Sequence, residues 1–149
     1  MRILHCCLAC FYIDNYSYQE NILPRYHKLM GHEVKIIAST ESFDKNGRIT
    51  YIDAKRYMNE DGIEVVRLPY VAYIPDKAVK KLRRYKGLWE ELNSFKPDFI
   101  FIHDIQFLDI DIIRKYAKKH TVKIVADCHA DFSNSARNFI SRKVLHGIV

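Results

Sequence analysis

The sequence is organised around one stretch, Lys123-Ile124-Val125-Ala126-Asp127-Cys128-His129-Ala130-Asp131. Around its start lies a short β-branched run, Val122 to Val125, which is bounded by polar residues and is typical of a buried strand. In an open α/β sheet, ligands bind in the crevice at the carboxyl ends of the strands. The pattern therefore predicts that His129 and Asp131 belong to a functional site. The alternative is that these two side chains only cap backbone groups of the turn and of the following helix.

Strand and helix patterns alternate along the chain. Apolar runs predict strands at 2–9, 33–38, 62–68, 99–102 and 122–126, and a further short strand at 49–53. Helices are expected from the capping-box pattern Ser17-Tyr18-Gln19-Glu20 onward, at 77–95, at 107–120 and after Asn134-Ser135. This order predicts an α/β fold with a Rossmann-like, doubly wound, mostly parallel sheet and helices on both faces. Residues 1–149 are expected to form a single domain.

Composition limits the class of protein. The chain has 149 residues, of which 48% are hydrophobic and 28% charged, so an ordinary globular domain is expected. No apolar run approaches the ~20 residues of a membrane-spanning helix, and the start of the chain does not resemble a secretory signal. Four cysteines without an export signal favour reduced thiols and a cytoplasmic location. The net charge of +6 favours an acidic or phosphate-bearing partner.

Several common sites lack their motifs. The segment after the first strand has no glycine-rich fingerprint of the dinucleotide-binding or P-loop type. Cys7-Leu8-Ala9-Cys10 is a Cys-x-x-Cys motif, and Cys10, Cys128, His103 and His129 could converge on a metal. Buried structural thiols are the commoner outcome, so neither a metal nor a resident cofactor is expected.

The basic residues of the 77–95 segment have two interpretations. A basic amphipathic helix binds anionic lipid, and in this view Lys80, Lys81, Arg83 and Arg84 face a membrane. Peripheral binding to the inner face of the membrane is then expected. The other interpretation is a solvated helix face. Nucleic acid is not an expected partner, because no nucleic-acid-binding motif accompanies the charge.

Several stretches together resemble one enzyme family. Lys96-Pro97-Asp98-Phe99-Ile100-Phe101-Ile102-His103 is similar to a signature of the N-terminal domain of GT-B glycosyltransferases in the retaining family-four group. Gly31-His32-Glu33-Val34 is similar to the segment that begins the second strand of that domain, and Asp127-Cys128-His129 to its strand-end histidine. The segments 17–21 and 129–138 resemble members of bacterial polysaccharide type.

This resemblance implies an activity and roles for particular residues. The chain would be the acceptor-binding half of an enzyme that moves a sugar from a nucleotide-sugar donor to a glycan or lipid-linked acceptor. The donor would bind mainly to a C-terminal domain that this sequence lacks. His129 would be the catalytic residue that contacts the transferred sugar, His103 would line the acceptor side, and Asp131 would bind substrate. Tyr12, Asp14 and Asn15 would face the acceptor or the donor phosphates, although the family's Gly-Gly pair is missing from this loop.

The nucleotide-sugar would be a co-substrate, and the 149-residue chain alone is expected to show no turnover. Two other functions remain open. The chain could be a non-catalytic binding subunit that needs a partner chain carrying the donor site. It could also be an unrelated flavodoxin-like or hydrolase domain that uses His129 and Asp131 as a base pair. A Gly-x-Ser-x-Gly nucleophile motif, which would support acyl transfer, is absent from the sequence.

Overall fold

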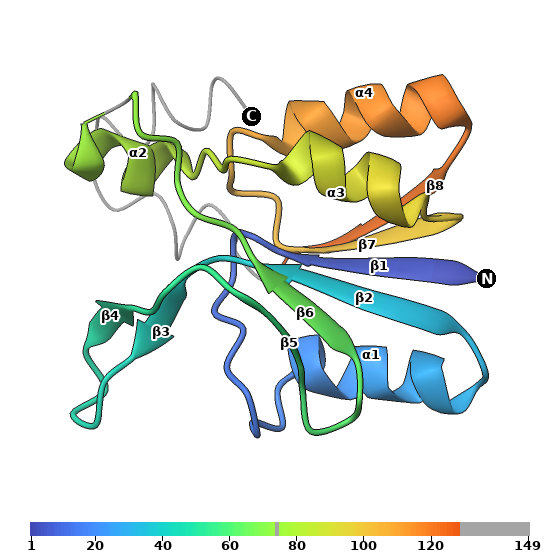
Figure 1. Ribbon diagram of the computed structural model, residues 1–149, viewed down its shortest axis with the longest axis horizontal. Coiled ribbons are helices and arrows are strands. Elements are labelled where there is room, and N and C mark those ends of the chain that lie inside the picture. The colour runs from blue at the N-terminus through green and yellow to red at the C-terminus, as the bar shows by residue number, and fades with distance from the viewer. Residues whose placement is uncertain (74, 129–149) are drawn as a thin grey trace.

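The computed structural model describes residues 1–73 and 75–128, and this part of the chain is built on a six-stranded sheet in the order β5-β6-β2-β1-β7-β8 (Figure 1). Five strands run parallel: β1 (Arg2–Cys7), β2 (Glu33–Ala38), β6 (Glu64–Arg67), β7 (Phe99–His103) and β8 (Lys123–Asp127). A short edge strand, β5 (Arg56–Met58), pairs antiparallel with β6. The Rossmann-like fold class predicted from the sequence is confirmed.

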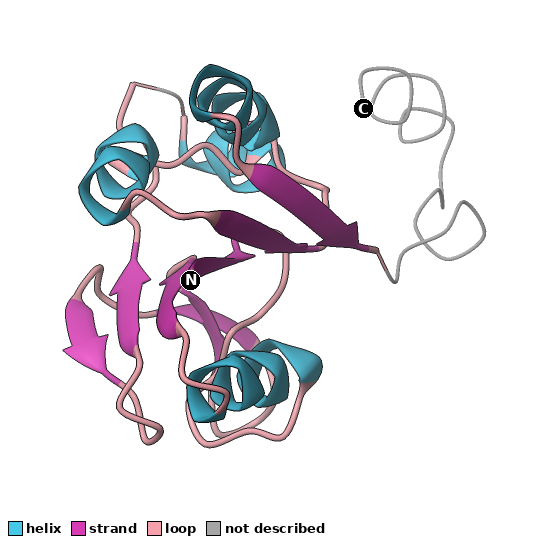
Figure 2. Cartoon of the chain, turned by 90° about the vertical axis from the view of Figure 1, so that its right-hand side faces the viewer, coloured by secondary structure: helices cyan, strands magenta, loops and turns pink. Residues whose placement is uncertain are grey.

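Helices cover both faces of this sheet (Figures 1 and 2). Helix α1 (Gln19–Leu29) lies on one face, and α3 (Leu88–Phe95) and α4 (Ile110–His120) lie on the other. A hairpin of β3 (Glu41–Phe43) and β4 (Ile49–Tyr51) follows β2 and lies beyond the carboxyl ends of the parallel strands. The loop after β1, the end of β7 and this hairpin therefore meet at the same edge.

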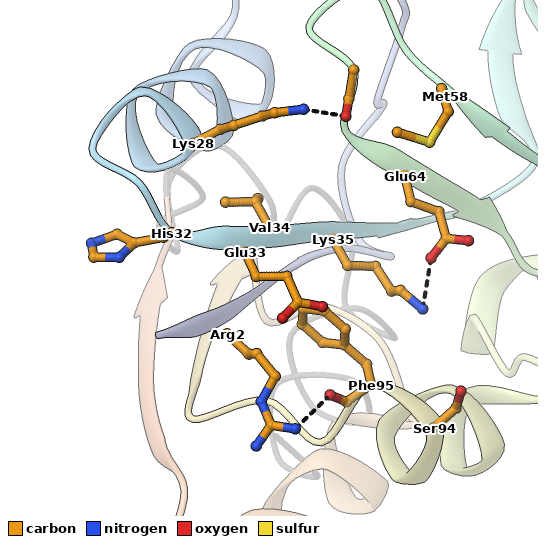
Figure 3. Close-up of a pocket in the computed structure, with 11 residues that line it drawn as sticks. Arg2, Lys28, His32, Glu33, Val34, Lys35, Met58, Glu64, Ser94 and Phe95 are labelled. Atoms are coloured by element: carbon orange, nitrogen blue, oxygen red, sulfur yellow. Dashed lines mark hydrogen bonds and ion pairs between the residues drawn. The ribbon is translucent and has the colours of Figure 1, made fainter.

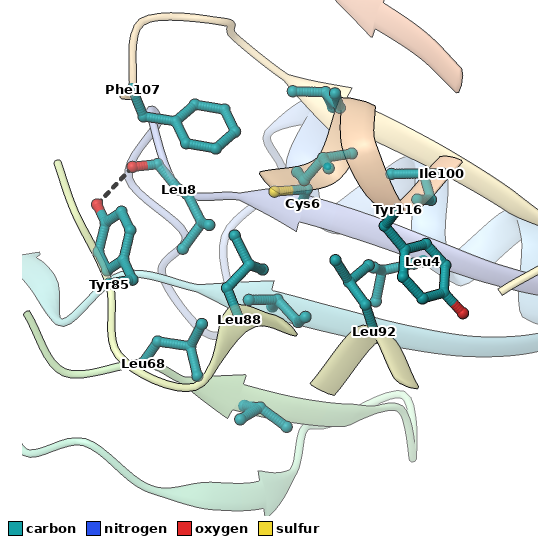
Figure 4. Packing of buried hydrophobic residues seen from close by; sticks show 14 of the residues in the cluster. Leu4, Cys6, Leu8, Leu68, Tyr85, Leu88, Leu92, Ile100, Phe107 and Tyr116 are labelled. Atoms are coloured by element: carbon teal, nitrogen blue, oxygen red, sulfur yellow. Dashed lines mark hydrogen bonds between the residues drawn. The ribbon is translucent and has the colours of Figure 1, made fainter. Parts of the chain in front are cut away.

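The larger core cluster lies between the sheet and the α3–α4 layer (Figure 4). Leu4 of β1 and Ile100 of β7 pack against Leu92 of α3 and Tyr116 of α4, and all four side chains are almost fully buried. Burial of a large apolar side chain stabilises a fold by about 1.5–3 kcal/mol. This packing therefore holds β1 and β7, and with them their carboxyl ends, in place.

The contact face of α1 differs from the one its sequence predicts. Apolar residues recur here at a spacing that puts them on one helical face, which favours burial of that face, but they are exposed: Tyr18, Ile22, Tyr26, Leu29 and Met30. The buried positions are Asn21 and Pro24 instead. Asn21 donates to the carbonyl oxygen of Ile13, which ties the helix to the loop after β1. The expected capping box is also not formed, because Tyr18 is the N-cap and makes no side-chain capping bond.

The single helix predicted at 77–95 is two helices. Helix α2 (Asp76–Leu82) ends at Arg83, whose φ of 51° is left-handed, and α3 begins after Gly87, whose φ is 92°. A left-handed residue cannot continue an α-helix, so the chain turns between them. Helix α4 begins at Ile110, three residues later than expected, so Leu108 precedes it. The helix predicted after Asn134-Ser135 lies outside the described residues.

Candidate functional site

A cavity of about 430 Å³ lies at the carboxyl edge of the sheet. It opens where β1, β7 and β8 end, and the loop after β1, the start of α1 and the β3–β4 hairpin complete it. Its lining combines aromatic side chains, carboxylates, one imidazole and one thiol, contributed by Ala9, Cys10, Phe11, Tyr18, Glu20, Phe43, His103, Asp104 and Asp127. This is the position at which open α/β sheets bind ligands.

His103 is the sequence-predicted site residue that the structure places in this cavity. It is the last residue of β7, and although its side chain lines the cavity, only 4% of the residue is exposed. Its Nε2 lies 3.0 Å from Nδ1 of His5 in β1. The ring is therefore held from behind by a buried group.

The two carboxylates beside His103 are also held. Asp127 pairs with His103 in the β7–β8 register, and its Oδ2 accepts a 2.6 Å hydrogen bond from the amide of Gln19 in α1. Asp104 has a left-handed φ of 65°, and its backbone N–H donates to the carbonyl oxygen of Asp127. These contacts link the first turn of α1 to the ends of β7 and β8.

The aromatic wall comes from two separate segments. Phe11 lies in the loop after β1 and Phe43 at the end of β3, and their ring centroids are 4.6 Å apart. Tyr18, the residue before α1, also lines the cavity. Aromatic faces beside carboxylates suit a ligand that has both apolar C–H faces and hydroxyl groups.

The predicted binding residues Tyr12, Asp14 and Asn15 are not among the described residues that line the cavity. Tyr12 is fully buried and its hydroxyl accepts a hydrogen bond from Asn59. Asp14 accepts hydrogen bonds from the hydroxyl of Tyr57, and Asn15 donates its backbone N–H to Glu60. Their observed contacts fix the loop after β1, and their binding of a substrate stays a prediction.

Buried Arg67 is the centre of this loop network. It donates to the carbonyl oxygens of Tyr12 and Ser39 and to the hydroxyl of Tyr57, each at 3.0 Å. Burial, and then the hydrogen bond to Asp14, raises the pKa of the Tyr57 hydroxyl. Tyr57 is therefore a neutral hydrogen-bond donor at physiological pH.

His129 and Asp131, the predicted catalytic residue and its acidic neighbour, lie outside the described residues. Their roles stay predictions. Among residues 1–73 and 75–128, no group of three or more histidine, cysteine or acidic side chains is arranged to hold a metal ion.

The basic residues that were predicted to face a membrane divide into two pairs. Arg83 donates to the carbonyl oxygen of Ala9 and lies 3.4 Å from Glu41, while Arg84 lies 3.0 Å from buried Asp109. These two guanidinium groups form ion pairs within the fold, because they lie in the turn between α2 and α3 rather than on a continuous helix face.

The other pair remains on α2. Lys81 is exposed, and Nζ of Lys80 lies 4.0 Å from the centroid of the Tyr51 ring. Membrane contact by Lys80 and Lys81 stays a prediction. In the part of the chain that the structure describes, no helix combines the length and the apolar character needed to cross a bilayer.

A second cavity, of about 550 Å³, lies at the opposite edge of the sheet (Figure 3). Its three cationic side chains already contact groups of the protein: Lys28 donates to the carbonyl oxygen of Gly62, Lys35 lies 2.8 Å from Glu64, and Arg2 donates to the carbonyl oxygen of Phe95. This edge carries the amino ends of the parallel strands, so the carboxyl-edge cavity is the better candidate despite its smaller volume.

The sequence did not identify most of the cavity lining. Phe11, Tyr18, Glu20 and Phe43 come from loops or helix and strand ends without a local motif. Asp104 directly follows β7 and Asp127 ends β8, and this position at a strand end is the one signal that points to them. The burial predicted for the strand at Val122 to Val125 was wrong, because β8 is an edge strand of the described sheet and Val125 is 44% exposed. The aromatic residues meet only because the β3–β4 hairpin folds beside the loop after β1.

Comparisons with known proteins bear on the architecture. No protein-family model matches the sequence, and no curated protein matches it. A solved structure, sucrose-phosphate synthase from Thermosynechococcus elongatus, is similar over 99% of this chain, with a TM-score of 0.57 and 13% sequence identity. This likeness shows the fold. The chain spans 39% of the length of that structure.

Proposed function

We propose that this chain is the acceptor-binding, N-terminal half of a retaining glycosyltransferase. It would move a sugar from a nucleotide-sugar donor to a glycan or lipid-linked acceptor, with the donor held mainly by a separate donor-binding domain. The observation that carries the proposal is the carboxyl-edge cavity, in which Phe11 and Phe43 face the same space as His103, Asp104 and Asp127. The similarity of the fold of this chain to part of the sucrose-phosphate synthase structure supports a glycosyltransferase-like architecture.

The lining suits a sugar acceptor. A sugar ring presents C–H groups that pack on an aromatic face, and hydroxyl groups that donate to carboxylates and imidazoles. Asp104 and Asp127 are held by backbone and side-chain contacts. A hydroxyl group of a bound sugar would therefore meet carboxylate oxygens in fixed positions. Such preorganisation lowers the entropic cost of orienting the acceptor.

The chemistry also explains why one half is insufficient. Glycosyl transfer passes through an oxocarbenium-like state while negative charge develops on the leaving diphosphate. Positioning the two substrates and excluding water require a second surface opposite this cavity. In this proposal the carboxyl-edge cavity supplies one of these surfaces. His129 remains the proposed contact with the transferred sugar, and Asp131 remains a proposed substrate-binding residue.

Binding to the purified 149-residue chain tests the proposal. Oligosaccharides and nucleotide-sugars are titrated while amide NMR signals are recorded, and weak oligosaccharide binding is expected to shift signals of Phe11, Phe43 and Asp104. Nucleotide-sugars are expected to cause smaller shifts, and no sugar transfer is expected. Shifts confined to the opposite cavity around Lys35 would exclude the proposed acceptor site. Turnover by the isolated chain would exclude its assignment as a half-enzyme.

A lipid-linked acceptor would place the protein beside a membrane. Exposed Lys81 and neighbouring Lys80 are the proposed contacts with anionic lipid. Sedimentation with liposomes that contain anionic lipid is expected to exceed sedimentation with neutral liposomes, and Lys81→Glu is expected to reduce the difference. Equal sedimentation with both kinds of liposome would contradict electrostatic binding.

A further inference from the structure

Three imidazoles form a continuous hydrogen-bonded row behind the cavity. Nε2 of His103 lies 3.0 Å from Nδ1 of His5, and Nε2 of His5 lies 2.9 Å from Nδ1 of His27. The row begins at the cavity lining on β7, passes through a fully buried position on β1 and ends at a half-buried position on α1. The proposed acceptor site uses only the first of these rings.

Described titratable groups lie at both ends of the row. His103 shares the cavity with Glu20 of α1, Asp104 and Asp127. His27 contacts the ring of His32, with centroids 6.2 Å apart. Phe101 of β7 packs against both His5 and His103. Burial, and then the neighbouring imidazoles His103 and His27, lowers the pKa of His5, so this ring is neutral at physiological pH.

Neutral imidazoles can satisfy both hydrogen bonds in only two ways. Either each Nε2 carries the proton and the next Nδ1 accepts, or each Nδ1 carries the proton and donates back toward the cavity. Both sets of tautomers use the same atoms at the same distances. The tautomer of His103, which lines the cavity, is therefore coupled to the tautomer of His27 on α1.

We propose that His103, His5 and His27 form a proton relay between the carboxyl-edge cavity and the solvent beside α1. In the first set of tautomers, each ring holds its proton on Nε2. A proton that arrives at Nδ1 of His103 allows its Nε2 proton to pass to Nδ1 of His5, and the Nε2 proton of His5 to pass to Nδ1 of His27. His27 then releases its Nε2 proton to solvent. Three N–H bonds form, three break, and every ring remains neutral.

The use of this relay rests on the proposed function. An acceptor hydroxyl loses its proton when it is glycosylated, and that proton must leave a cavity that a second domain would close. The relay gives it a path that does not pass through the cavity mouth. Once the cavity is open again, the reverse transfer restores the first set of tautomers: a solvent proton enters at Nε2 of His27, and the Nδ1 proton of His103 leaves to solvent through the open cavity mouth. In this scheme His5 and His27 act through His103 and are positioning residues.

Nitrogen-15 NMR of the imidazole rings tests the relay without any turnover, so its failure is distinguishable from failure of the proposed function. In the unaltered protein, His103, His5 and His27 are expected to show the same tautomer, with their ring signals changing together during an acid titration. His27→Gln alters only the half-buried end of the row. It is expected to shift the ring nitrogens of His103, which lies two rings away.

Two further variants complete the test. His5→Phe keeps an aromatic ring but breaks both hydrogen bonds, so His27 and His103 are expected to titrate independently. His120→Gln changes a histidine on α4, outside the row, and is expected to leave the signals of His103 unchanged. Opposite tautomers at His5 and His27 in the unaltered protein would overturn the relay. Unchanged ring nitrogens of His103 in His27→Gln would overturn it as well.

Discussion

The guanidinium group of Arg67, on β6, donates a 3.0 Å hydrogen bond to the carbonyl oxygen of Tyr12, which lies 55 residues earlier in the chain. The Arg67 side chain is 1% exposed and also lies 3.4 Å from a carboxylate oxygen of Asp14. One buried cation therefore holds the loop that forms a wall of the cavity. A buried charge that serves several acceptors is costly to remove, because each acceptor loses its partner.

Arg67→Met is expected to lower the free energy of unfolding by about 3 kcal/mol, because two carbonyl oxygens and Tyr57 lose their donor while Asp14 loses its ion pair. Urea denaturation measures the change. Arg56→Met is the matched control, since Arg56 also forms ion pairs but its own side chain is 48% exposed. The control is expected to cost less than about 1 kcal/mol. Equal losses in the two variants would show that the loop network is not important for stability.

Asp109→Ala is expected to destabilise the protein by about 3 kcal/mol. The buried carboxylate of Asp109 accepts a 2.6 Å hydrogen bond from the backbone N–H of Tyr85 and a 3.0 Å bond from Arg84, so it fixes the turn between α2 and α3 against the start of α4. Thermal and urea unfolding measure the loss. Asp111→Ala, two residues later, removes a carboxylate that is 63% exposed and is expected to cost under about 1 kcal/mol. A similar cost for both would contradict this role of Asp109.

Stability is expected to fall as the solution is acidified through the range in which histidine titrates. Burial lowers the pKa of His5 below 6.5, and burial followed by the neighbouring His32 lowers that of His27. The unfolded chain therefore binds protons before the folded protein does. This stabilisation is present above pH 6.5 and is lost as the pH falls toward the lowered pKa values, with a slope of at most about 1.4 kcal/mol per pH unit for each imidazole.

Urea unfolding at about pH 7.5 and about pH 5.5 measures this dependence. His5→Phe is expected to flatten it, because the variant has no buried imidazole at that position. His120→Gln is expected to keep the slope of the unaltered protein, since this exposed histidine lies on α4. An unchanged slope in His5→Phe would show that His5 does not cause the acid sensitivity.

Phe43→Ala is expected to weaken oligosaccharide binding about tenfold, because it removes one side of the aromatic wall. Phe43 is 38% exposed, so the fold is expected to remain intact. Ile49→Ala is the matched control. Ile49 pairs with Phe43 in the same hairpin and is 58% exposed, but it is not one of the described cavity-lining residues. Titration calorimetry that shows equal affinities for the two variants would exclude a contribution from the aromatic wall.

The sequence predicted the parallel strands well, because buried strands such as Phe99–His103 are nearly continuous apolar runs. It did not predict β5 or the hairpin partner β3, since Arg56–Met58 and Glu41–Phe43 are three-residue segments without alternation. The apolar spacing of α1 did not indicate which face is buried, because burial of Asn21 depends on a hydrogen bond to the loop after β1. Periodicity alone has no information about that contact.

The candidate site was predicted in part. His103 was expected at a strand end because β7 is an apolar run that ends there. His5 was not expected to take part, since a single histidine within an apolar strand gives no sign of its neighbours. Its two partners, 22 and 98 residues away, meet it only in the folded chain. The aromatic wall depends in the same way on the packing of a hairpin beside a loop.

The antiparallel edge strand β5 has a consequence for how molecules of this protein meet one another. It is three residues long, and Arg56 within it is engaged with Glu64 and Glu91. A short, charged edge strand offers few unpaired backbone groups to a strand of another molecule. It therefore disfavours edge-to-edge pairing of sheets into fibres. We expect heat-induced aggregates to nucleate at other parts of the molecule rather than at β5.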